Sequence, residues 1–253
     1  MLFDTHCHIH ESSYSLPVDE VMRRANEVGV SGMICVGTNE QSSADAITFA
    51  KQYDMVFASI GVHPHDAKDG WGSIESLAKQ HDAEQKLVAV GEIGLDYYYS
   101  YSSREVQIAA LEAQIQVALD HDLPIIFHVR DAFDDFWPIF DNFHGIRGEL
   151  HSFTDTQTNL DKGFERGLYV GVNGISTFTK DAQQRQMYAT IPLDRMVLET
   201  DAPFLTPAPY RGTVNEPAYV SEVARHHATL RGIAIDEVAH ATTANATALF
   251  RLK

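Results

Sequence analysis

The sequence predicts a (β/α)₈ barrel that forms a single domain over residues 1–253. Eight short apolar runs alternate with helix-length segments along the whole chain, and a length of 253 residues is typical of this fold. Most runs are almost continuously apolar, as expected for parallel strands that are covered on both faces. The runs span 2–8, 32–37, 56–62, 87–94, 124–129, 148–153, 168–172 and 195–200. A doubly wound sheet gives a similar alternation, but it usually has fewer strands and a glycine-rich first turn, which this sequence lacks.

The segments between these runs have helical patterns. Pro17 suits the first turn of a helix over 17–28, and Gly29 suits its end. Residues 235–250 predict an extra helix after the last barrel unit. Four apolar residues recur at helical spacing on one face of segment 103–121: Ile108, Leu111, Ile115 and Leu119.

The composition is that of a globular protein with a strong acidic excess. Lys and Arg number 19 and Asp and Glu number 35, which gives a net charge of −16. Such a chain has no global attraction for nucleic acid or an anionic membrane, so any phosphate would have to be bound by local cations or by metal. Cys7 and Cys35 do not form a CxxC pair, which excludes a cysteine zinc cage. With no signal peptide and no 18-residue apolar run, the expected setting is the cytoplasm, away from membranes.

Six residues with metal-ligating side chains lie at the carboxyl ends of predicted strands. His6 and His8 are two residues apart on the first strand, so both imidazoles are expected on the same face. The other four end the fourth, fifth, sixth and eighth strands: Glu92, His128, His151 and Asp201. In a (β/α)₈ barrel these strand ends converge on the mouth that holds the active site. A single histidine there is more often a hydrogen-bonded core residue, but six such residues together indicate a metal site, because burying them without a cation would be costly.

Six protein ligands are too many for one catalytic ion that keeps an open coordination position. They suit two ions that share a bridging carboxylate, for which Glu92 is the best placed. One ion is expected on His6, His8, Glu92 and Asp201, and the second on Glu92, His128 and His151. Two ions about 3.5–4 Å apart lower the pKa of a water molecule and clamp the attacking and leaving oxygens of an in-line displacement.

Two further residues at the same strand ends are candidates for substrate binding. His63, in GVHPH, can donate a hydrogen bond to a substrate oxygen, unless it only caps the turn at Pro64. Arg211, in a loop after the last strand, can bind a phosphate with two hydrogen bonds. The alternative for this loop is a structural one, held by Asn215 and Glu216 before a helix over 217–231.

Other charged residues near the strand ends have less certain partners. Glu199 precedes Asp201 by two residues and is expected to orient a water molecule or a ligand histidine. Asp96 is expected on a loop above the site. Arg130 would share the face of His128 if the strand continues, but pairing with Asp131 is favoured. Six other histidines are expected on the solvated surface: His81, His121, His144, His226, His227 and His240.

Seven ordered motifs between residues 5 and 217 carry a family resemblance: THCHIH, GVHPH, GEIGLDYY, HVRDA, HSF, LETDAPFL and RGTVNEP. Together they resemble the TatD family of metal-dependent deoxyribonucleases. The resemblance implies a (β/α)₈ barrel of the wider metal-dependent hydrolases, with divalent-metal-dependent cleavage of DNA phosphodiester bonds. The family's metal ligands match the six residues named above, and His63 and Arg211 match positions on its substrate side.

The first functional hypothesis is a two-metal deoxyribonuclease acting on single-stranded ends or short fragments, with Glu92 as the bridge and Asp201 or Glu199 accepting the proton of the attacking water. The charge of −16 predicts weak DNA binding with few phosphate contacts. No protein partner can be inferred. Four imidazoles favour Zn²⁺, Fe²⁺, Mn²⁺ or Co²⁺ over Mg²⁺, whereas the resemblance suggests activity with Mg²⁺.

The main alternative is an amidohydrolase-like enzyme that hydrolyses a lactone, an amide or an aminoacyl ester. Many relatives with those activities carry a carboxylated lysine at the fourth-strand position where this chain has Glu92, which favours phosphoester chemistry. A third hypothesis, from another class, is a metal-binding scaffold without enzymatic activity.

Overall fold

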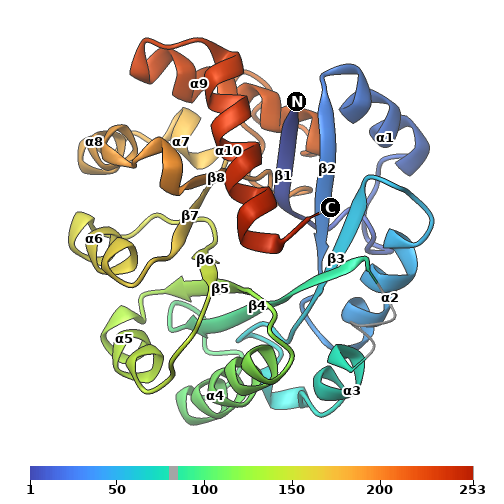
Figure 1. Ribbon diagram of the computed structural model, residues 1–253, viewed down its shortest axis with the longest axis vertical. Helices are drawn as coiled ribbons and strands as arrows, with labels where there is room; N and C mark the ends of the chain where they lie inside the picture. The colour runs from blue at the N-terminus through green and yellow to red at the C-terminus, as the bar shows by residue number, and fades with distance from the viewer. Residues whose placement is uncertain (80–84, 253) are drawn as a thin grey trace. The chain divides into compact units, whose positions relative to one another are not determined.

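The structure of the protein is a computed structural model that describes residues 1–79 and 85–252 (Figure 1). Its sheet has eight strands whose order is the order of the chain, from β1 to β8. The strands are β1 Leu2–Cys7, β2 Val30–Val36, β3 Val56–Ile60, β4 Leu87–Asp96, β5 Ile125–Arg130, β6 Gly148–Leu150, β7 Tyr169–Val172 and β8 Met196–Leu198. Each of the eight predicted runs overlaps one of these strands, and the prediction of a (β/α)₈ barrel is confirmed.

Helices separate the strands along the chain. The α-helices are α1 Val18–Glu27, α2 Glu40–Ala50, α3 Ile74–Ala78, α4 Arg104–Asp120, α5 Phe133–Asp141, α6 Gln157–Glu165, α7 Ile175–Phe178, α8 Ala182–Thr190, α9 Val220–Arg231 and α10 Ile235–Phe250. Short 3₁₀ turns are η1 Ala67–Asp69, η2 Leu193–Arg195 and η3 Pro217–Tyr219. The predicted terminal helix and the helix over 103–121 are confirmed as α10 and α4.

The chain forms two compact units. The middle unit comprises Cys35–His151, and the terminal unit comprises Met1–Ile34 and Ser152–Lys253. That the chain acts as one domain stays a prediction. Within the described residues, no helix is long and apolar enough to cross a membrane.

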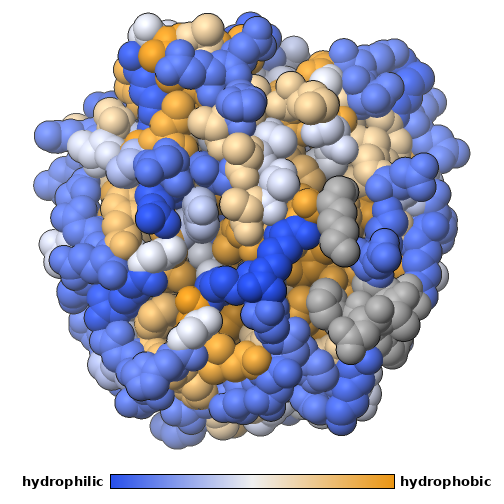
Figure 2. Space-filling model, in the orientation of Figure 1, coloured by the Kyte–Doolittle hydropathy of each residue, from blue (hydrophilic) through white to orange (hydrophobic). Residues whose placement is uncertain are grey.

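In the middle unit, strands β3 to β6 pair in parallel and helices α2 to α5 pack beside them (Figure 1). The aromatic rings of Phe127 on β5 and Phe136 on α5 meet edge to face at 5.1 Å, and both side chains are fully buried. Leu111 and Ile115, predicted as the apolar face of α4, are also fully buried. The outward surfaces of α4 and α5 are largely hydrophilic (Figure 2). Burial of these apolar faces therefore fixes the four strands whose ends carry the polar residues described below.

Gly94 lets β4 and β5 approach closely beside those polar residues. It pairs in register with His128, and its backbone φ is +157°. A Cβ atom at this position would lie 1.7 Å from the carbonyl oxygen of His128, so no side chain fits.

Substitution of Gly94 by Ala is expected to lower the free energy of unfolding by about 3 kcal/mol, because the new methyl group meets backbone that cannot move away. Urea unfolding followed by circular dichroism measures this loss. Gly70→Ala is the matched control in the same unit, since Gly70 also has a positive φ, +102°, but no atom lies within 4 Å of its added Cβ. Equal losses in the two variants would contradict the steric explanation.

In the terminal unit, α10 packs against β1 and β8 (Figure 1). The side-chain amide of Asn245 on α10 donates hydrogen bonds to the carbonyl oxygens of Leu193 and Met196, both at 2.8 Å. These bonds fix the start of β8, the strand that leads to Glu199 and Asp201.

One histidine of this unit lies where the sequence interpretation did not place it. His227 on α9 was expected on the surface but is fully buried, with Nε2 3.1 Å from the Ser176 hydroxyl and Nδ1 2.7 Å from the Arg231 guanidinium. Burial, with the nearby Arg231 charge, keeps the pKa of His227 well below its usual value. His81, another of the six, lies outside the described residues.

Candidate metal centre

The middle unit gathers polar side chains around the carboxylate of Glu92. Glu92 lies on β4 and is 4% exposed, and its Oε1 is 2.8 Å from Nδ1 of His128 on β5. The Nε2 atoms of His151 and His63 lie 3.6 Å and 3.7 Å from the same Oε1. These four residues are called the Glu92 cluster below. Three of them were predicted as ligands of one ion, and His63 was predicted for the substrate.

Backbone hydrogen bonds at the strand ends position this cluster. The His151 amide donates to the Phe127 carbonyl at 2.9 Å, and the His63 amide donates to the Thr38 carbonyl at 2.8 Å. All ten residues of β4 are buried, so Glu92 is carried by a strand that apolar packing holds in place. Parallel pairing of β4 with β5 then brings His128 beside it.

Asp96 supports the Glu92 cluster and was not recognised from the sequence. The expectation of a loop position is wrong, because Asp96 is the last residue of β4 and its side chain is buried. Its Oδ2 lies 3.0 Å from Nε2 of His128 and 3.0 Å from Nε2 of His65. The HxH spacing of His63 and His65 was the sequence signal for a second histidine here. Asp96 therefore orients two imidazoles, the usual task of a carboxylate behind a metal-ligating histidine.

Hydrogen bonding and burial shift the pKa values of His128 and His63 in opposite directions. Burial opposes protonation of His128, but its hydrogen bonds with Asp96 and Glu92 prevail and raise the pKa of this histidine. Burial, reinforced by the nearby His128, keeps the pKa of His63 well below its usual value. The pKa of Asp96 is lowered, because hydrogen bonds from His128 and the backbone outweigh its burial. His63 is thus a neutral imidazole at pH 7, able to bind metal or to donate one N–H.

The terminal unit contains a second set of converging ligands. The Nε2 atoms of His6 and His8 lie 3.1 Å apart, and Oδ1 of Asp201 lies 3.7 Å and 3.4 Å from them respectively. The strand alternation predicted this convergence of the two imidazoles. The Asp201 amide donates to the His6 carbonyl at 2.8 Å, and the His8 amide donates to the Ala202 carbonyl at 2.7 Å. These two bonds fasten the loop after β8 to the end of β1. His6, His8 and Asp201 are called the Asp201 cluster below.

Glu199 and Asp4 are buried carboxylates that brace the terminal unit. Oε1 of Glu199 accepts hydrogen bonds from the Ser152 amide at 2.9 Å and from the Asn173 side chain at 3.0 Å. Asp4 accepts hydrogen bonds from the amide and hydroxyl of Thr200 at 2.8 Å and 2.6 Å. Asp4 was not recognised from the sequence, because a lone acidic residue at the start of a strand gives no signal.

Both sets of side chains fit a divalent metal ion. Ligand atoms about 2.0–2.2 Å from one ion lie roughly 3–3.5 Å from each other at the usual coordination angles. The 3.1 Å and 3.4 Å separations in the Asp201 cluster match this spacing. One ligand atom each from Glu92, His63 and His128 also lie within 4.8 Å of one another. Imidazole nitrogen with carboxylate oxygen suits Zn²⁺, Mn²⁺, Fe²⁺ or Co²⁺.

Arg211 lies in an exposed loop that hydrogen bonds hold in place. Its guanidinium donates to the Thr206 carbonyl at 2.7 Å and lies 3.8 Å from the ring centre of Phe178. Asn215 donates to the Thr200 carbonyl at 2.8 Å, and Glu216 accepts two hydrogen bonds from Arg24 Nε at 2.8 Å and 2.9 Å. The structural interpretation of Asn215 and Glu216 is supported, and phosphate binding by Arg211 stays a prediction.

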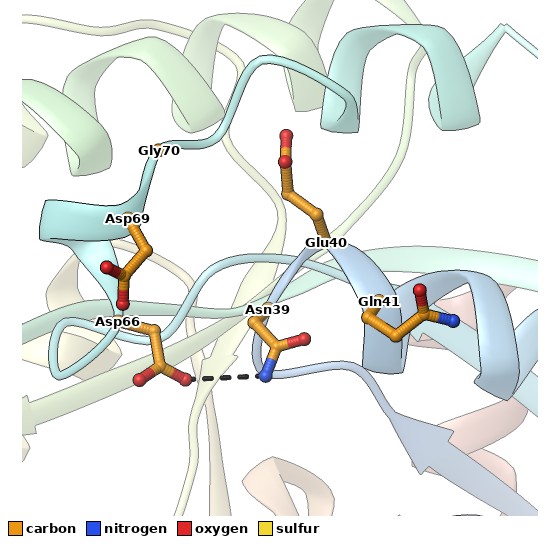
Figure 3. Close-up of a pocket in the computed structure, with 6 residues that line it drawn as sticks. All are labelled: Asn39, Glu40, Gln41, Asp66, Asp69 and Gly70. Carbon is orange, nitrogen blue, oxygen red and sulfur yellow. Dashed lines mark hydrogen bonds between the residues drawn. The ribbon is translucent and has the colours of Figure 1, made fainter.

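A hollow of about 270 Å³ in the middle unit is lined by Asn39, Glu40, Gln41, Asp66, Asp69 and Gly70 (Figure 3). Asn39 donates a hydrogen bond to Asp66 across it, at 3.5 Å. Three carboxylates line this hollow and no cationic side chain does, so it repels phosphate. The hollow does not suit an anionic substrate.

Comparison with known proteins decides the family. A family model described as TatD related DNase matches residues 3–251. The chain belongs to the TatD family. It is 37% identical, over all of both chains, to the "Uncharacterized metal-dependent hydrolase YabD" of Bacillus subtilis strain 168. It is 34% identical to the "3'-5' ssDNA/RNA exonuclease TatD" of Erwinia tasmaniensis, over 99% of this chain and 100% of that relative.

A solved structure of another TatD-family protein has the same fold. The structure of YjjV, a TatD homologue from Escherichia coli K12, is 28% identical to this chain. It superposes with a TM-score of 0.91, over 100% of this chain and 98% of that one. The prediction of a TatD-family metal-dependent hydrolase is confirmed.

Proposed function

We propose that this TatD-family hydrolase is a divalent-metal-dependent nuclease that removes nucleotides from an end of short or single-stranded DNA. One observation carries the proposal: Glu92 is a buried carboxylate hydrogen-bonded to His128, in a family with members named as single-strand exonucleases. A carboxylate at this position supports phosphoester hydrolysis over the lysine-dependent hydrolysis of amides and lactones.

The residues that would hold metal fall into the two clusters described above. In the middle unit they are Glu92, His128 and His151, and in the terminal unit they are His6, His8 and Asp201. We expect two ions per chain, which these two sets of residues would hold. A divalent ion supplies Lewis-acid stabilisation of the charge on the phosphate oxygens and lowers the pKa of a water molecule.

Side chains of the protein would accept the proton of the attacking water and bind the phosphate. Oε1 of Glu199 already accepts two hydrogen bonds, so we assign Glu199 to orienting its neighbours. The side chain of Asp201 is 15% exposed, so Asp201 is the better acceptor for the proton of the attacking water. His63 is neutral and can donate an N–H to a non-bridging phosphate oxygen. Arg211 would bind a phosphate from its exposed loop.

A screen of labelled oligonucleotides tests this function. Single- and double-stranded DNA and RNA, labelled at either end, are incubated with the protein and Mg²⁺, Mn²⁺, Co²⁺ or Zn²⁺, beside an amide and a lactone. Stepwise shortening of single-stranded DNA is the expected result. Turnover of the amide or lactone alone would replace the proposal with the amidohydrolase alternative, and no turnover on any ester would favour a metal-binding scaffold.

Binding of single-stranded DNA is expected to depend weakly on salt. With about two phosphate contacts, the affinity for a 20-mer falls only about sevenfold between 50 and 200 mM NaCl. Fluorescence anisotropy at several salt concentrations measures the slope, and an oligolysine titrated with the same DNA shows the steep dependence of many contacts. A decrease of 10³-fold for the protein would contradict the prediction and indicate a long basic footprint.

A further inference from the structure

Four tyrosines follow β4 within five residues, and three of them expose their rings. Tyr98, Tyr99 and Tyr101 are 57%, 38% and 56% exposed, values that are high for large apolar side chains. We propose that these tyrosines and Arg130 form a platform on which the bases of the single-stranded substrate stack beside the Glu92 cluster. This inference rests on the proposed function and specifies that the protein recognises the bases of the substrate.

The three rings already form a contiguous surface. Tyr99 and Tyr101 stack with 16° between their planes and 5.3 Å between their centres. Tyr98 meets Tyr99 edge to face at 4.7 Å. Exposed aromatic rings are a feature by which proteins bind unpaired bases, and each stacked base contributes about 1–3 kcal/mol.

His65 connects the platform to the polar residues of the middle unit. Its ring centre lies 5.3 Å from that of Tyr99 and 4.9 Å from that of Tyr101. Its Nε2 lies 3.0 Å from Asp96, and the same carboxylate oxygen lies 3.0 Å from His128. Through His65 and Asp96, the tyrosine rings are therefore linked by direct contacts to His128 of the Glu92 cluster.

Arg130 supplies a positive charge on the same surface. Its guanidinium lies 3.8 Å from the ring centre of Tyr98 and 5.3 Å from that of Tyr99, so the expected pairing with Asp131 is wrong. Within the residues that the structure describes, the Arg130 guanidinium has no hydrogen bond or ion pair, whereas the neighbouring Arg104 is paired with Asp135. In a chain with a net charge of −16, this cation is a local attraction for phosphate.

Hydrogen bonds hold the tyrosine segment in place before any ligand binds. The amides of Tyr98 and Tyr99 donate to Oδ1 of Asp96 at 3.0 Å and 3.2 Å. The side chain of Gln107 accepts from the Asp96 amide and donates to the carbonyls of Asp96 and Ser102, at 2.9, 3.1 and 3.0 Å. Because the segment is fixed at both ends, binding a base costs little ordering entropy.

The platform also predicts which nucleic acids bind. Bases in a duplex are stacked on each other and cannot reach a protein ring, whereas unpaired bases can. Stacking accepts any base, because every base has an aromatic face. Single strands should therefore be preferred over duplexes, with little sequence preference.

Binding of a fluorescein-labelled single-stranded DNA 10-mer, followed by anisotropy, tests the proposal. Tyr98→Ala and Tyr101→Ala are each expected to weaken binding about 5- to 100-fold, whereas Tyr98→Phe and Tyr101→Phe keep the ring and restore binding. In hydrolysis the loss should appear mainly as a higher KM. Thermal unfolding of each variant shows whether it remains folded, and binding of an abasic strand to the wild-type protein carries the test if an alanine variant is unfolded.

A strand of abasic nucleotides separates stacking from phosphate binding. The wild type should bind it at least as weakly as either alanine variant binds the 10-mer, and the alanine variants should bind it no more weakly than the wild type does. Arg130→Ala should weaken binding of both strands. Arg147→Ala is the matched control, because Arg147 is at the opposite end of the strands, next to the start of β6, where it pairs with Asp122.

Two results would overturn the platform: alanine variants that bind like the wild type, or an abasic strand that binds the wild type as well as the 10-mer. A wild type that binds through the tyrosines but cleaves no nucleic acid would refute the proposed function and leave the platform standing. Cleavage without any dependence on the tyrosines would do the reverse.

Discussion

Replacement of Glu92 by Gln is expected to lower kcat/KM on a single-stranded oligonucleotide by about 10³-fold or more. The amide has the size of the carboxylate but no charge, so it cannot neutralise a divalent ion or accept a charge-assisted hydrogen bond from His128. Since Oε1 also lies 3.6–3.7 Å from His151 and His63, one change weakens the ligand set of the whole middle unit. Rates with each added metal, together with metal content by mass spectrometry, measure the effect.

Glu112→Gln is the matched control, because Glu112 lies on the exposed face of α4 in the same unit. It removes the same charge and should keep both metal and rate. A Glu92→Gln protein that retains its metal and works within tenfold of the wild-type rate would contradict the assignment. Partial loss of metal, by one ion or by two, would also show whether Glu92 serves one ion or bridges both, as the sequence predicts.

The strands and the last helix were predictable because their signals are local. Buried parallel strands read as short continuous apolar runs, and the alternation of such runs with helical segments defines the fold class. The convergence of His6 and His8 followed from strand periodicity alone, and their Nε2 atoms lie 3.1 Å apart. The proximity of Glu92 and His128 was predicted because they lie on consecutive strands of the barrel.

Side-chain partners were predicted less well, because they depend on packing between distant segments. Arg130 was expected to pair with its neighbour in sequence, but its guanidinium lies on Tyr98, 32 residues away. Asp96 was placed in a loop because it lies beyond residue 94, where the predicted strand ended, whereas β4 continues to Asp96. His227 was taken as a surface residue, because a polar residue on an amphipathic helix usually is one. No pattern in the sequence indicates that the Ser176 hydroxyl lies beside His227.

Removal of the divalent metal is expected to abolish hydrolysis, by about 10³-fold or more, and to lower the thermal stability. A metal present at about 1,000 times its dissociation constant stabilises the folded state by about 4 kcal/mol. Dialysis against a chelator, followed by addition of Mn²⁺, Co²⁺, Zn²⁺ or Mg²⁺, tests whether activity and stability return together. Activity that survives complete metal removal would contradict the hydrolytic site described here.

The stabilisation by metal should also grow with pH, for a reason that lies in His128. In the metal-free protein its hydrogen bonds with Asp96 and Glu92 raise its pKa. A histidine with a raised pKa stabilises the fold fully below its unfolded pKa of about 6.5, and this stability is lost as the pH rises through the folded pKa. A metal ion requires the neutral imidazole, so it must displace this proton at low pH but not at high pH.

The difference in Tm between metal-loaded and metal-free protein is therefore expected to widen from pH 6 to pH 8.5. Asp96 does not titrate between pH 6 and pH 8.5, because its pKa is lowered. Its contribution to the stability of the fold is lost only at acid pH, as the pH falls. His128→Gln removes the titrating group and should flatten the pH dependence of the metal-free protein. A wild-type difference that stays constant across this range would mean that no proton is displaced, and His128 would then act as a hydrogen-bond partner of Glu92 and not as a metal ligand.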